Sequence, residues 1–381
     1  MTEYRILIVD DEAPMLRTVE RILGGDHEVL AVPSPETAIV LAPDFKPHVA
    51  VIDVRMAGMD GFQLMNMLKQ LDQDVQVILM TGSAYDIDDQ LIRAIREKAF
   101  YYITKPFDRE VLRTLVQRCL ELRTLEDANR RHVRHLEGQL AEARAFQMTM
   151  LPAREASLEG FDINAAYLPC EELGGDLYDY ASASPDTVSV VIADVAGHGA
   201  SAAMLTGIVK SAFHASLEEG YHPSAVVKRV EEGIRPFRSD RFITMLCASI
   251  SISDGTMTYI NAGHFGGTLA NAGEAPQSLD STGPLISPAL PIMTWEVETV
   301  AWRSNTRLLL YTDGIPETEC EGELFQSERI HKIIEDIPSG GPELLSAILS
   351  GADSFARGCP PVDDRTLITV HYGGKSELQT S

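Results

Sequence analysis

The sequence of 381 residues predicts an α/β protein with two domains joined by a helix. Between residues 4 and 107, five apolar strand patterns alternate with helical patterns, which is typical of a doubly wound parallel sheet with helices on both faces. From residue 112 the pattern changes to heptads, and Pro152 ends this helix because proline cannot continue it. Beyond it, strand patterns and glycines predict a mixed α/β layered domain. We therefore expect domains at 1–120 and 151–373, a linker helix at 112–150 and a flexible tail at 374–381.

The first domain shows its strands as short apolar runs. They read YRILIV, HEVLAV, HVAVID, VQVILM and YYIT, and a helical pattern follows each of the first four. In open sheets of this kind, ligands lie at the carboxyl ends of the strands. The informative residues of this domain are therefore those that end its strands.

Acidic side chains stand at two of these strand ends. Asp10 and Asp11 follow the first strand, and Asp53 ends the third. Because neighbouring carboxylates repel one another, we expect a divalent cation between them, and their hard oxygen ligands suit Mg²⁺. Thr81 and Lys105 end the fourth and fifth strands and offer a hydroxyl and an ammonium group to a phosphorylated carboxylate. Together these residues predict a phosphoryl-transfer site.

These residues, in this order on five strand ends, resemble the receiver domain of two-component response regulators over residues 4 to about 120. The resemblance implies that Asp53 accepts a phosphoryl group from a sensor histidine kinase. It also implies that Thr81 and Tyr102 switch conformation and that Lys105 binds the phosphate. The implied Mg²⁺ ligands are Asp10, Asp11, Asp53 and the carbonyl group of Arg55.

The linker region has a heptad pattern whose two core positions are mostly apolar. Arg and Glu enrich its flanking positions, so the pattern favours a continuous helix that pairs with a second copy as a coiled coil. At about 1.5 Å per residue it would extend roughly 60 Å, longer than a small domain needs. The alternative is an amphipathic helix packed on its own domain. The core residues are Leu112, Cys119, Val133 and Leu140 at one position and Leu115, Leu122, Leu136, Ala143 and Met150 at the other, interrupted by Glu126, Asn129 and Gln147.

The second domain is expected to mix strands and helices in layers. Strand patterns cover residues 161–168, 187–193, 243–252, 256–261, 295–301, 306–312 and 366–372. Helical patterns cover residues 201–218, 223–235, 326–335 and 342–356.

Four segments of the second domain place an acid between a strand and a turn: GGDLYDY, ADVAGHG, LLLYTDGIPE and PPVDDRTLITV. Each acid alone is equally well explained as a helix cap or a turn residue. Gathered at one end of a β core, however, several carboxylates would repel one another unless cations were bound between them. Paired hard cations can activate a water molecule against a phosphate ester. The acids are Asp176, Asp194, Asp313, Asp363 and Asp364.

These segments resemble the metal-dependent serine/threonine phosphatases of the PPM (protein phosphatase 2C-like) family, in their bacterial SpoIIE branch, over about residues 146 to 372. The resemblance implies an α/β layered sandwich. It implies that Asp194 bridges two Mn²⁺ or Mg²⁺ ions, with help from the Val195 carbonyl group. Asp176 would bind one ion, and Asp313 and Asp363 the other.

Three nearby residues have roles that the sequence leaves open. Adjacent residues of a strand point to opposite sides, so we assign Asp363 as the metal ligand and keep Asp364 as a possible one, expected to support the site from behind. His198 and His264 could each protonate a leaving alkoxide, but a histidine beside glycines is as often a structural hydrogen-bonding group.

The resemblances together imply a response regulator that removes phosphate from serine or threonine of a partner protein, an anti-anti-sigma factor. The alternative is an adaptor that uses the same fold to bind a partner without catalysis. A net charge of −24 opposes binding to nucleic acid, which disfavours a third class, the DNA-binding regulators. No apolar run is long enough to span a bilayer and the first residues lack a signal-peptide pattern, so we expect a cytoplasmic protein.

Overall fold

The computed structural model describes residues 4–82, 101–197, 199–237, 240–271, 273–303, 305–337 and 340–373. The chain divides into two compact units, Met1–Glu137 and Gly138–Ser381, and each is described by itself. Within the described ranges, no helix combines the length and the apolar character needed to cross a membrane.

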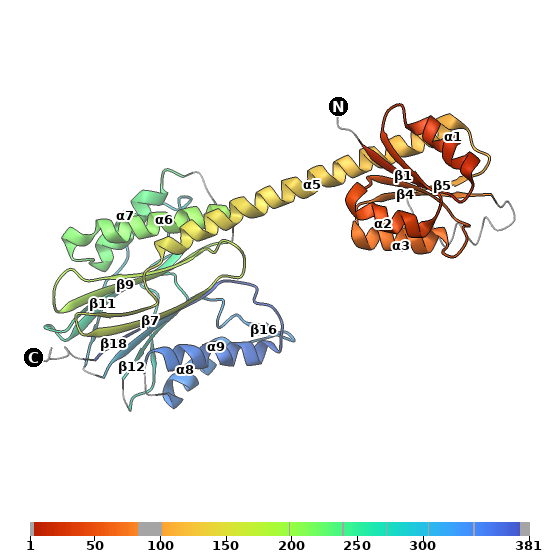
Figure 1. Cartoon of the computed structure of the whole chain (residues 1–381). Helices are drawn as coiled ribbons and strands as arrows, with labels where there is room; N and C mark the ends of the chain where they lie inside the picture. The colour runs from red at the N-terminus through yellow and green to blue at the C-terminus, as the bar shows by residue number, and fades with distance from the viewer. Residues whose placement is uncertain are drawn as a thin grey trace, which may run out of the picture. The chain divides into compact units, whose positions relative to one another are not determined.

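The first unit is a parallel five-stranded sheet in the order β2-β1-β3-β4-β5 (Figure 1). All five predicted strands are confirmed, and the order makes β1 and β3 neighbours. The helical pattern predicted after the fourth strand lies outside the described residues. The strands are β1 (Arg5–Val9), β2 (Glu28–Val32), β3 (Val49–Asp53), β4 (Gln76–Thr81) and β5 (Tyr101–Thr104), and the helices of this unit before the linker are α1 (Ala13–Leu23), α2 (Pro35–Phe45) and α3 (Gly61–Leu71).

The linker is one helix, α5 (Arg109–Met150), as the heptad pattern predicted. Its first turns pack on the first unit, because Leu112 and Cys119 are fully buried in a cluster with residues of β1, β3 and β4. Glu126 accepts a hydrogen bond from Nε2 of Gln76, 3.0 Å away, and so also faces this unit. The N-terminal part of α5 therefore follows the alternative interpretation, an amphipathic helix packed on its own domain.

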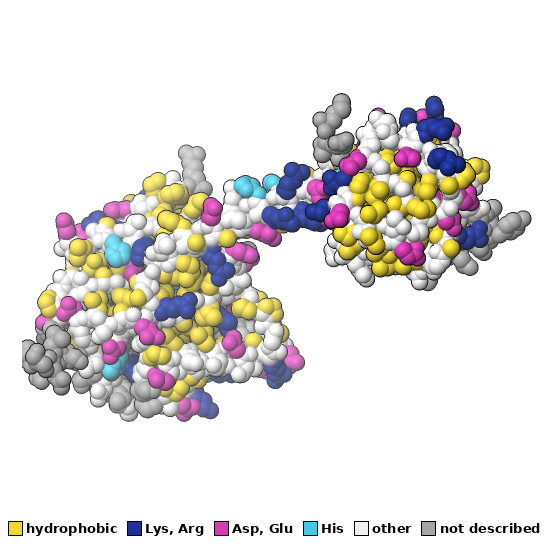
Figure 2. Space-filling model, viewed as in Figure 1, with side chains coloured by type: hydrophobic (Ala, Val, Ile, Leu, Met, Phe, Trp, Pro, Cys, Tyr) yellow, Lys and Arg dark blue, Asp and Glu magenta, His cyan; other side chains and the backbone are white. Residues whose placement is uncertain are grey.

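An apolar stripe remains exposed farther along α5. Leu125, Val133, Leu136 and Leu140 are between 41% and 67% exposed. Arg side chains lie along the exposed middle of α5 (Figure 2). Of the predicted heptad seam, Val133, Leu136, Leu140 and Ala143 are exposed in the described chain and could be covered by a second copy, whereas Leu125 lies outside the predicted seam.

The second unit is a sandwich of two mostly antiparallel sheets with a pair of helices on each outer face (Figure 1). Helices α6 and α7 cover the sheet β14-β11-β10-β9-β8, and α8 and α9 cover the sheet β13-β12-β15-β18-β7-β6. Helix bounds are α6 (Ala200–Ala215), α7 (Pro223–Ile234), α8 (Gln326–Asp336) and α9 (Pro342–Ala356). Strand bounds are β6 (Glu155–Leu158), β7 (Phe161–Leu168), β8 (Asp176–Ala181), β9 (Thr187–Val195), β10 (Ile243–Ser251), β11 (Thr256–Ala262), β12 (Gly266–Ala270), β13 (Gln277–Ser278), β14 (Glu298–Ala301), β15 (Arg307–Tyr311) and β18 (Arg365–Tyr372), with a small hairpin of β16 (Glu319–Cys320) and β17 (Glu323–Leu324).

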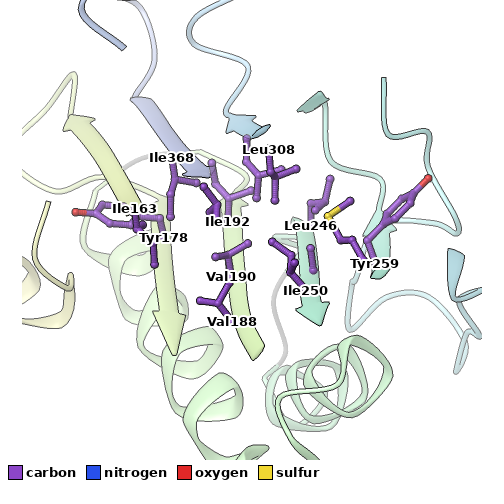
Figure 3. Packing of buried hydrophobic residues seen from close by; sticks show 14 of the residues in the cluster. Ile163, Tyr178, Val188, Val190, Ile192, Leu246, Ile250, Tyr259, Leu308 and Ile368 are labelled. Carbon is purple, nitrogen blue, oxygen red and sulfur yellow. The ribbon is translucent and has the colours of Figure 1, made fainter. Parts of the chain in front are cut away.

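The core of the second unit lies between the two sheets, where apolar side chains from both inner faces meet (Figure 3). The side chains of Val190 and Ile192, two residues apart on β9, both point into this core, and Ile368 of β18 enters it from the opposite sheet. Each predicted strand and helix of this domain is present, although β14 is shorter than its predicted range. The sequence patterns missed β8 and β12, because acids and glycines interrupt their apolar residues, and they also missed the short strands β6, β13, β16 and β17.

Candidate functional sites

The first acidic cluster lies where β1 and β3 end side by side. The carboxylate oxygens of Asp10, Asp11 and Asp53 lie within 4.8 Å of one another. Asp10 and Asp53 are buried, whereas Asp11 is exposed. The parallel pairing of β1 with β3 brings these strand ends together, as the sequence predicted.

A lysine already lies within this cluster. Nζ of Lys105 is 2.6 Å from Oδ2 of Asp10 and 2.9 Å from Oδ1 of Asp53. Burial raises the pKa of Asp53 above its ordinary value, although the ammonium group of Lys105 acts in the opposite direction. One fixed cation therefore offsets part of the charge of three carboxylates.

The other predicted residues of this unit surround the cluster at different depths. Thr81 is buried at the end of β4, the strand that pairs with β3. Tyr102 is half-buried on β5, and Arg55 is exposed just after β3. The cluster contains Asp10, Asp11, Asp53 and Lys105, with Thr81 on the adjacent strand end.

The second acidic site lies at one end of the sandwich and takes residues from both sheets. Asp176 begins β8 and is the register partner of Asp194 near the end of β9. In the other sheet, Asp313 follows β15, and Asp363 and Asp364 precede β18. Because β15 and β18 are paired neighbours, these turns meet at the same end.

Two threonines connect the sheets at this end. The hydroxyl groups of Thr312 and Thr366 donate to Oδ2 of Asp176, at 2.8 and 2.6 Å. Both threonines belong to the sheet opposite Asp176. The two hydrogen bonds therefore fix one oxygen of a buried carboxylate across the interface between the sheets.

The two consecutive acids before β18 have different surroundings. Asp364 is buried, and its two oxygens accept the backbone N–H groups of Cys170 (2.8 Å) and Gly175 (2.7 Å). Asp363 is exposed, and its Oδ1 accepts the N–H of Asp364 at 2.7 Å. Asp364 is thus held by backbone groups of the segment before β8, whereas Asp363 lies at the exposed side of the turn; which of them would bind a metal stays a prediction.

Glycine allows the two turns to approach closely. A Cβ atom added at Gly314 would lie 2.1 Å from the carbonyl oxygen of Asp364, closer than any real contact allows. On the other sheet, the N–H of Val195 donates to the carbonyl oxygen of Gly175 at 3.1 Å. The residues next to Asp313, Asp194 and Asp176 are thus held by short backbone contacts.

The carboxyl groups of this site are costly to ionise. Burial and the charge of Asp194 raise the pKa of Asp176 well above its ordinary value. Burial and the charge of Asp313 raise the pKa of Asp194 to about 7, and burial and the charge of Asp363 raise the pKa of Asp313 to about 6. Within the described part of the chain, no lysine or arginine forms a salt bridge with these three residues. Desolvated hard oxygens that repel one another are a suitable ligand set for divalent cations.

His264 lies near this site but is fully engaged by other groups. Its Nδ1 is 3.1 Å from Oγ1 of Thr244, and its Nε2 is 3.1 Å from the carbonyl oxygen of Tyr311. A carbonyl oxygen only accepts, so Nε2 carries the proton. Burial lowers the pKa of His264 to about 4, so the ring is neutral and ties β10 to β15. His198, the other histidine considered, lies outside the described residues.

The structure also shows residues that sequence reasoning missed. Thr312 and Thr366 were adjacent to predicted acids, but only the pairing of the sheets reveals their common partner. Gln147 was treated as an interruption of the heptads, yet it is buried against Gly174. Cys170 is not among the predicted site residues, and its sulfur lies within 4.8 Å of carboxylate oxygens of Asp363 and Asp364.

Two family models match the chain. The response regulator receiver domain matches residues 6–117, and Stage II sporulation protein E (SpoIIE) matches residues 184–373. The chain joins a receiver domain to a SpoIIE-type PPM domain. The receiver domain holds the first acidic cluster, and the SpoIIE-type domain extends over most of the second unit. Both resemblances inferred from the sequence are thereby confirmed.

Curated relatives resemble different parts of the chain. IcfG of Synechocystis sp. is 26% identical over 61% of this chain and 41% of its own length. RsbU of Bacillus subtilis, named a phosphoserine phosphatase, is 25% identical over 53% of this chain and 60% of its own length. AtoC of Escherichia coli, a regulatory protein, is 36% identical over 36% of this chain and 29% of its own length. The chain therefore spans less than two thirds of each of these relatives.

Solved structures support the fold of the SpoIIE-type domain. The SiaA-PP2C domain of Pseudomonas aeruginosa has a TM-score of 0.56 at 20% identity and covers 63% of this chain and 98% of that chain. The RsbU and RsbW domains of Rv1364c from Mycobacterium tuberculosis give a TM-score of 0.51 at 23% identity, over 58% of this chain and 63% of that chain. At these identities the likeness establishes the fold alone.

Proposed function

We propose that this chain is a response regulator whose output is the metal-dependent hydrolysis of phosphoserine or phosphothreonine on a partner protein. The observation that supports it best is the second acidic site, where turns and strand ends of both sheets carry four predicted ligands, and the pKa values of Asp176, Asp194 and Asp313 are raised. A site that had lost catalysis would have no reason to keep so many repelling carboxylates. The ligands are Asp176, Asp194, Asp313 and Asp363, with the carbonyl group of Val195.

In the proposed reaction, a water oxygen forms a bond to phosphorus, the bond to the seryl or threonyl oxygen breaks, and that oxygen leaves as a hydroxyl group after gaining a proton. Two Mn²⁺ or Mg²⁺ ions in this site would supply Lewis-acid activation of the water and of the phosphoryl oxygens. Asp194, whose charge interacts with those of Asp176, Asp313 and Asp363, would be the acid shared by the two ions. Thr312 and Thr366 orient Asp176, and Asp364 holds the backbone of Gly175 beside it.

In the receiver domain, we propose that Asp53 accepts the phosphoryl group of a sensor histidine kinase. Asp10, Asp11 and the Arg55 carbonyl group would complete a Mg²⁺ site with Asp53. Lys105 already contacts Asp53 and is positioned to bind the transferred phosphate. Thr81 and Tyr102, on the neighbouring strands, are the proposed conformational switch.

We further propose an anti-anti-sigma factor as the phosphoprotein substrate and a homodimer formed through the exposed stripe of α5. The first proposal rests on the resemblance to the SpoIIE branch and to RsbU, which is 25% identical over 53% of this chain. The second rests on Val133, Leu136 and Leu140, apolar residues that are exposed at the spacing of a coiled-coil seam.

The decisive experiment is phosphate release by the full chain from a phosphoserine peptide, with Mn²⁺, Mg²⁺ or EDTA, before and after treatment with acetyl phosphate. We expect turnover with Mn²⁺ or Mg²⁺, none with EDTA, and a changed rate after acetyl phosphate. Mass spectrometry should locate the labile phosphate on Asp53 and find none in Asp53→Ala. A chain that binds a phosphoprotein but never turns it over would instead be an adaptor.

A further inference from the structure

The last turns of α5 contact the strand that carries Asp176. Gln147 is 4% exposed, although the helix before it is largely exposed. Its Nε2 donates to the carbonyl oxygen of Gly174 at 2.7 Å, and its Oε1 accepts the N–H of Gly174 at 3.2 Å. One side chain thus satisfies both polar groups of a buried residue two positions before Asp176.

The Gly174 backbone has no room to move away from this contact. A Cβ atom there would lie 2.4 Å from Oδ2 of Asp364 and 2.4 Å from the hydroxyl oxygen of Tyr167. The next residue, Gly175, donates its N–H to the same Asp364 oxygen. The segment is therefore enclosed between Gln147 on one side and the turn before β18 on the other.

The contact between Gln147 and Gly174 matters because of how β8, the strand that carries Asp176, is held in its sheet. β8 is the edge strand of its sheet, so ladder hydrogen bonds hold it on the β9 side alone. Two side-chain hydrogen bonds add to the ladder: the hydroxyl groups of Tyr178 and Tyr180 donate to the carbonyl oxygens of Pro152 and Ala153, at 3.3 and 2.9 Å. Residues that end α5 or follow it therefore hold β8, and Gln147 provides the contact nearest Asp176.

We propose that Gln147 is a positioning residue of the acidic site: it fixes the Gly174–Gly175 backbone and thereby holds Asp176 where a metal ion can bind it. The inference rests on the proposed metal-dependent function. It makes the C-terminal turns of α5 a structural part of the site, in addition to a linker. Residues that orient a ligand indirectly commonly contribute about 10- to 100-fold to metal affinity.

The test compares four full-length proteins: wild type, Gln147→Met, Gln139→Met and Tyr180→Phe. Methionine keeps the size of Gln147 without its hydrogen bonds, and Gln139 is an exposed residue of the same helix. Tyr180→Phe removes another contact between β8 and the residues after α5, farther from Asp176. Mn²⁺ binding is measured by electron paramagnetic resonance, and binding sites that Asp194→Asn lacks are assigned to the acidic site.

For Gln147→Met, we expect the dissociation constant for Mn²⁺ and the half-saturating Mn²⁺ concentration of turnover to rise about tenfold or more. The maximal rate at saturating Mn²⁺ should stay near that of wild type, and amide hydrogen exchange at residues 173–176 should accelerate. Gln139→Met and Tyr180→Phe should keep the wild-type affinity. Unchanged Mn²⁺ affinity in folded Gln147→Met would overturn the inference, and so would an equal loss in Tyr180→Phe.

A second variant decides the matter if Gln147→Met does not fold. Gln147→Asn keeps the polar group but is one methylene too short to reach Gly174, so the same loss of affinity is expected. Because binding is measured without turnover, the two proposals can fail separately. Wild type that binds Mn²⁺ but releases no phosphate rejects the proposed function, whereas wild-type binding by Gln147→Asn rejects this inference.

Discussion

The two acidic sites of the chain use the same side chain but differ in what offsets its charge. In the receiver domain, Lys105 lies within 3 Å of two of three clustered aspartates. In the SpoIIE-type domain, Asp176, Asp194 and Asp313 have no such partner in the described ranges, and the pKa of Asp194 rises to about 7. The first site is therefore partly neutral before any metal binds. The second has hydroxyl donors on Asp176 but, in the described chain, no fixed cation on these three residues, so it depends more strongly on ions from solution.

The largest effect is expected from replacing Asp194 in the acidic site of the SpoIIE-type domain, where no lysine of the described chain pairs with this acid. Asp194→Asn should lower phosphatase turnover more than about a hundredfold, because even residues that only orient a ligand contribute about 10- to 100-fold. Phosphate release with saturating Mn²⁺ measures this, and Asp336→Asn, at an exposed helix end, is the matched control. Full turnover by folded Asp194→Asn would refute the two-metal assignment.

The second prediction concerns the stability of the metal-free protein. Raised carboxyl pKa values mean that the folded chain binds more protons than the unfolded chain between pH 4 and 7, so folding stability falls as pH rises through this range. In EDTA, the melting temperature of the second unit should drop by at least a few °C from pH 5 to pH 7.5. Calorimetry checks this, and Mn²⁺ should reverse the drop.

Asp194→Asn supplies the control for that experiment. Because it removes one of the repelling charges, the metal-free variant should melt higher than metal-free wild type at pH 7.5. A variant that melts lower in EDTA would show that repulsion does not dominate this site.

A smaller effect is expected when the receiver site loses its lysine charge and so, like Asp176, Asp194 and Asp313 in the described chain, has no fixed cation. Lys105→Met removes the fixed cation, so Mg²⁺ should bind the remaining carboxylates several-fold more tightly. Calorimetric titration in an Asp194→Asn background isolates the receiver site. Lys332→Met, an exposed substitution with the same change of charge, should leave the affinity unchanged. Weaker Mg²⁺ binding by Lys105→Met would mean that holding the carboxylates in position is a larger effect of the lysine than offsetting their negative charge.

The smallest effect should come from changing how the two sites are connected. Inserting seven residues near residue 138 keeps the heptad register, so the apolar positions on either side of the insertion stay on one face of α5. Inserting four residues rotates the downstream apolar positions away from that face. We expect the first insertion to retain the response of turnover to acetyl phosphate and the second to alter it. Equal responses, or a monomeric parent protein in sedimentation, would exclude signalling through a paired helix.

The sequence could predict many acids of both sites because they adjoin the ends of strands. Apolar runs that stop at Asp10, Asp53 and Asp194 locate a strand end and an acid together. The parallel order of the first domain then requires its strand ends to meet. For the acids of the first domain, the local sequence pattern is therefore nearly sufficient to predict that they lie together.

The remaining residues depend on contacts between distant segments. Thr366 and Asp176 are 190 positions apart, and only the packing of the two sheets makes them partners. In the sequence, Gln147 is a polar interruption of the heptad pattern. Its contact with Gly174, just before β8, is visible only in the folded structure. The same limit explains α5, whose apolar positions near Leu112 looked like a dimer seam but are buried by the receiver domain.

The threonine pair on Asp176 has a consequence for the synthesis of the protein. The carboxylate emerges from the ribosome early in the second domain, but Thr366 lies on β18, the last strand described. Until that strand is made and inserted between β15 and β7, Asp176 lacks one of its two hydroxyl donors and the acids of the opposite sheet are not in place. Chains interrupted before β18 should therefore be unable to act on phosphoproteins, so that competence arises only with a nearly finished domain.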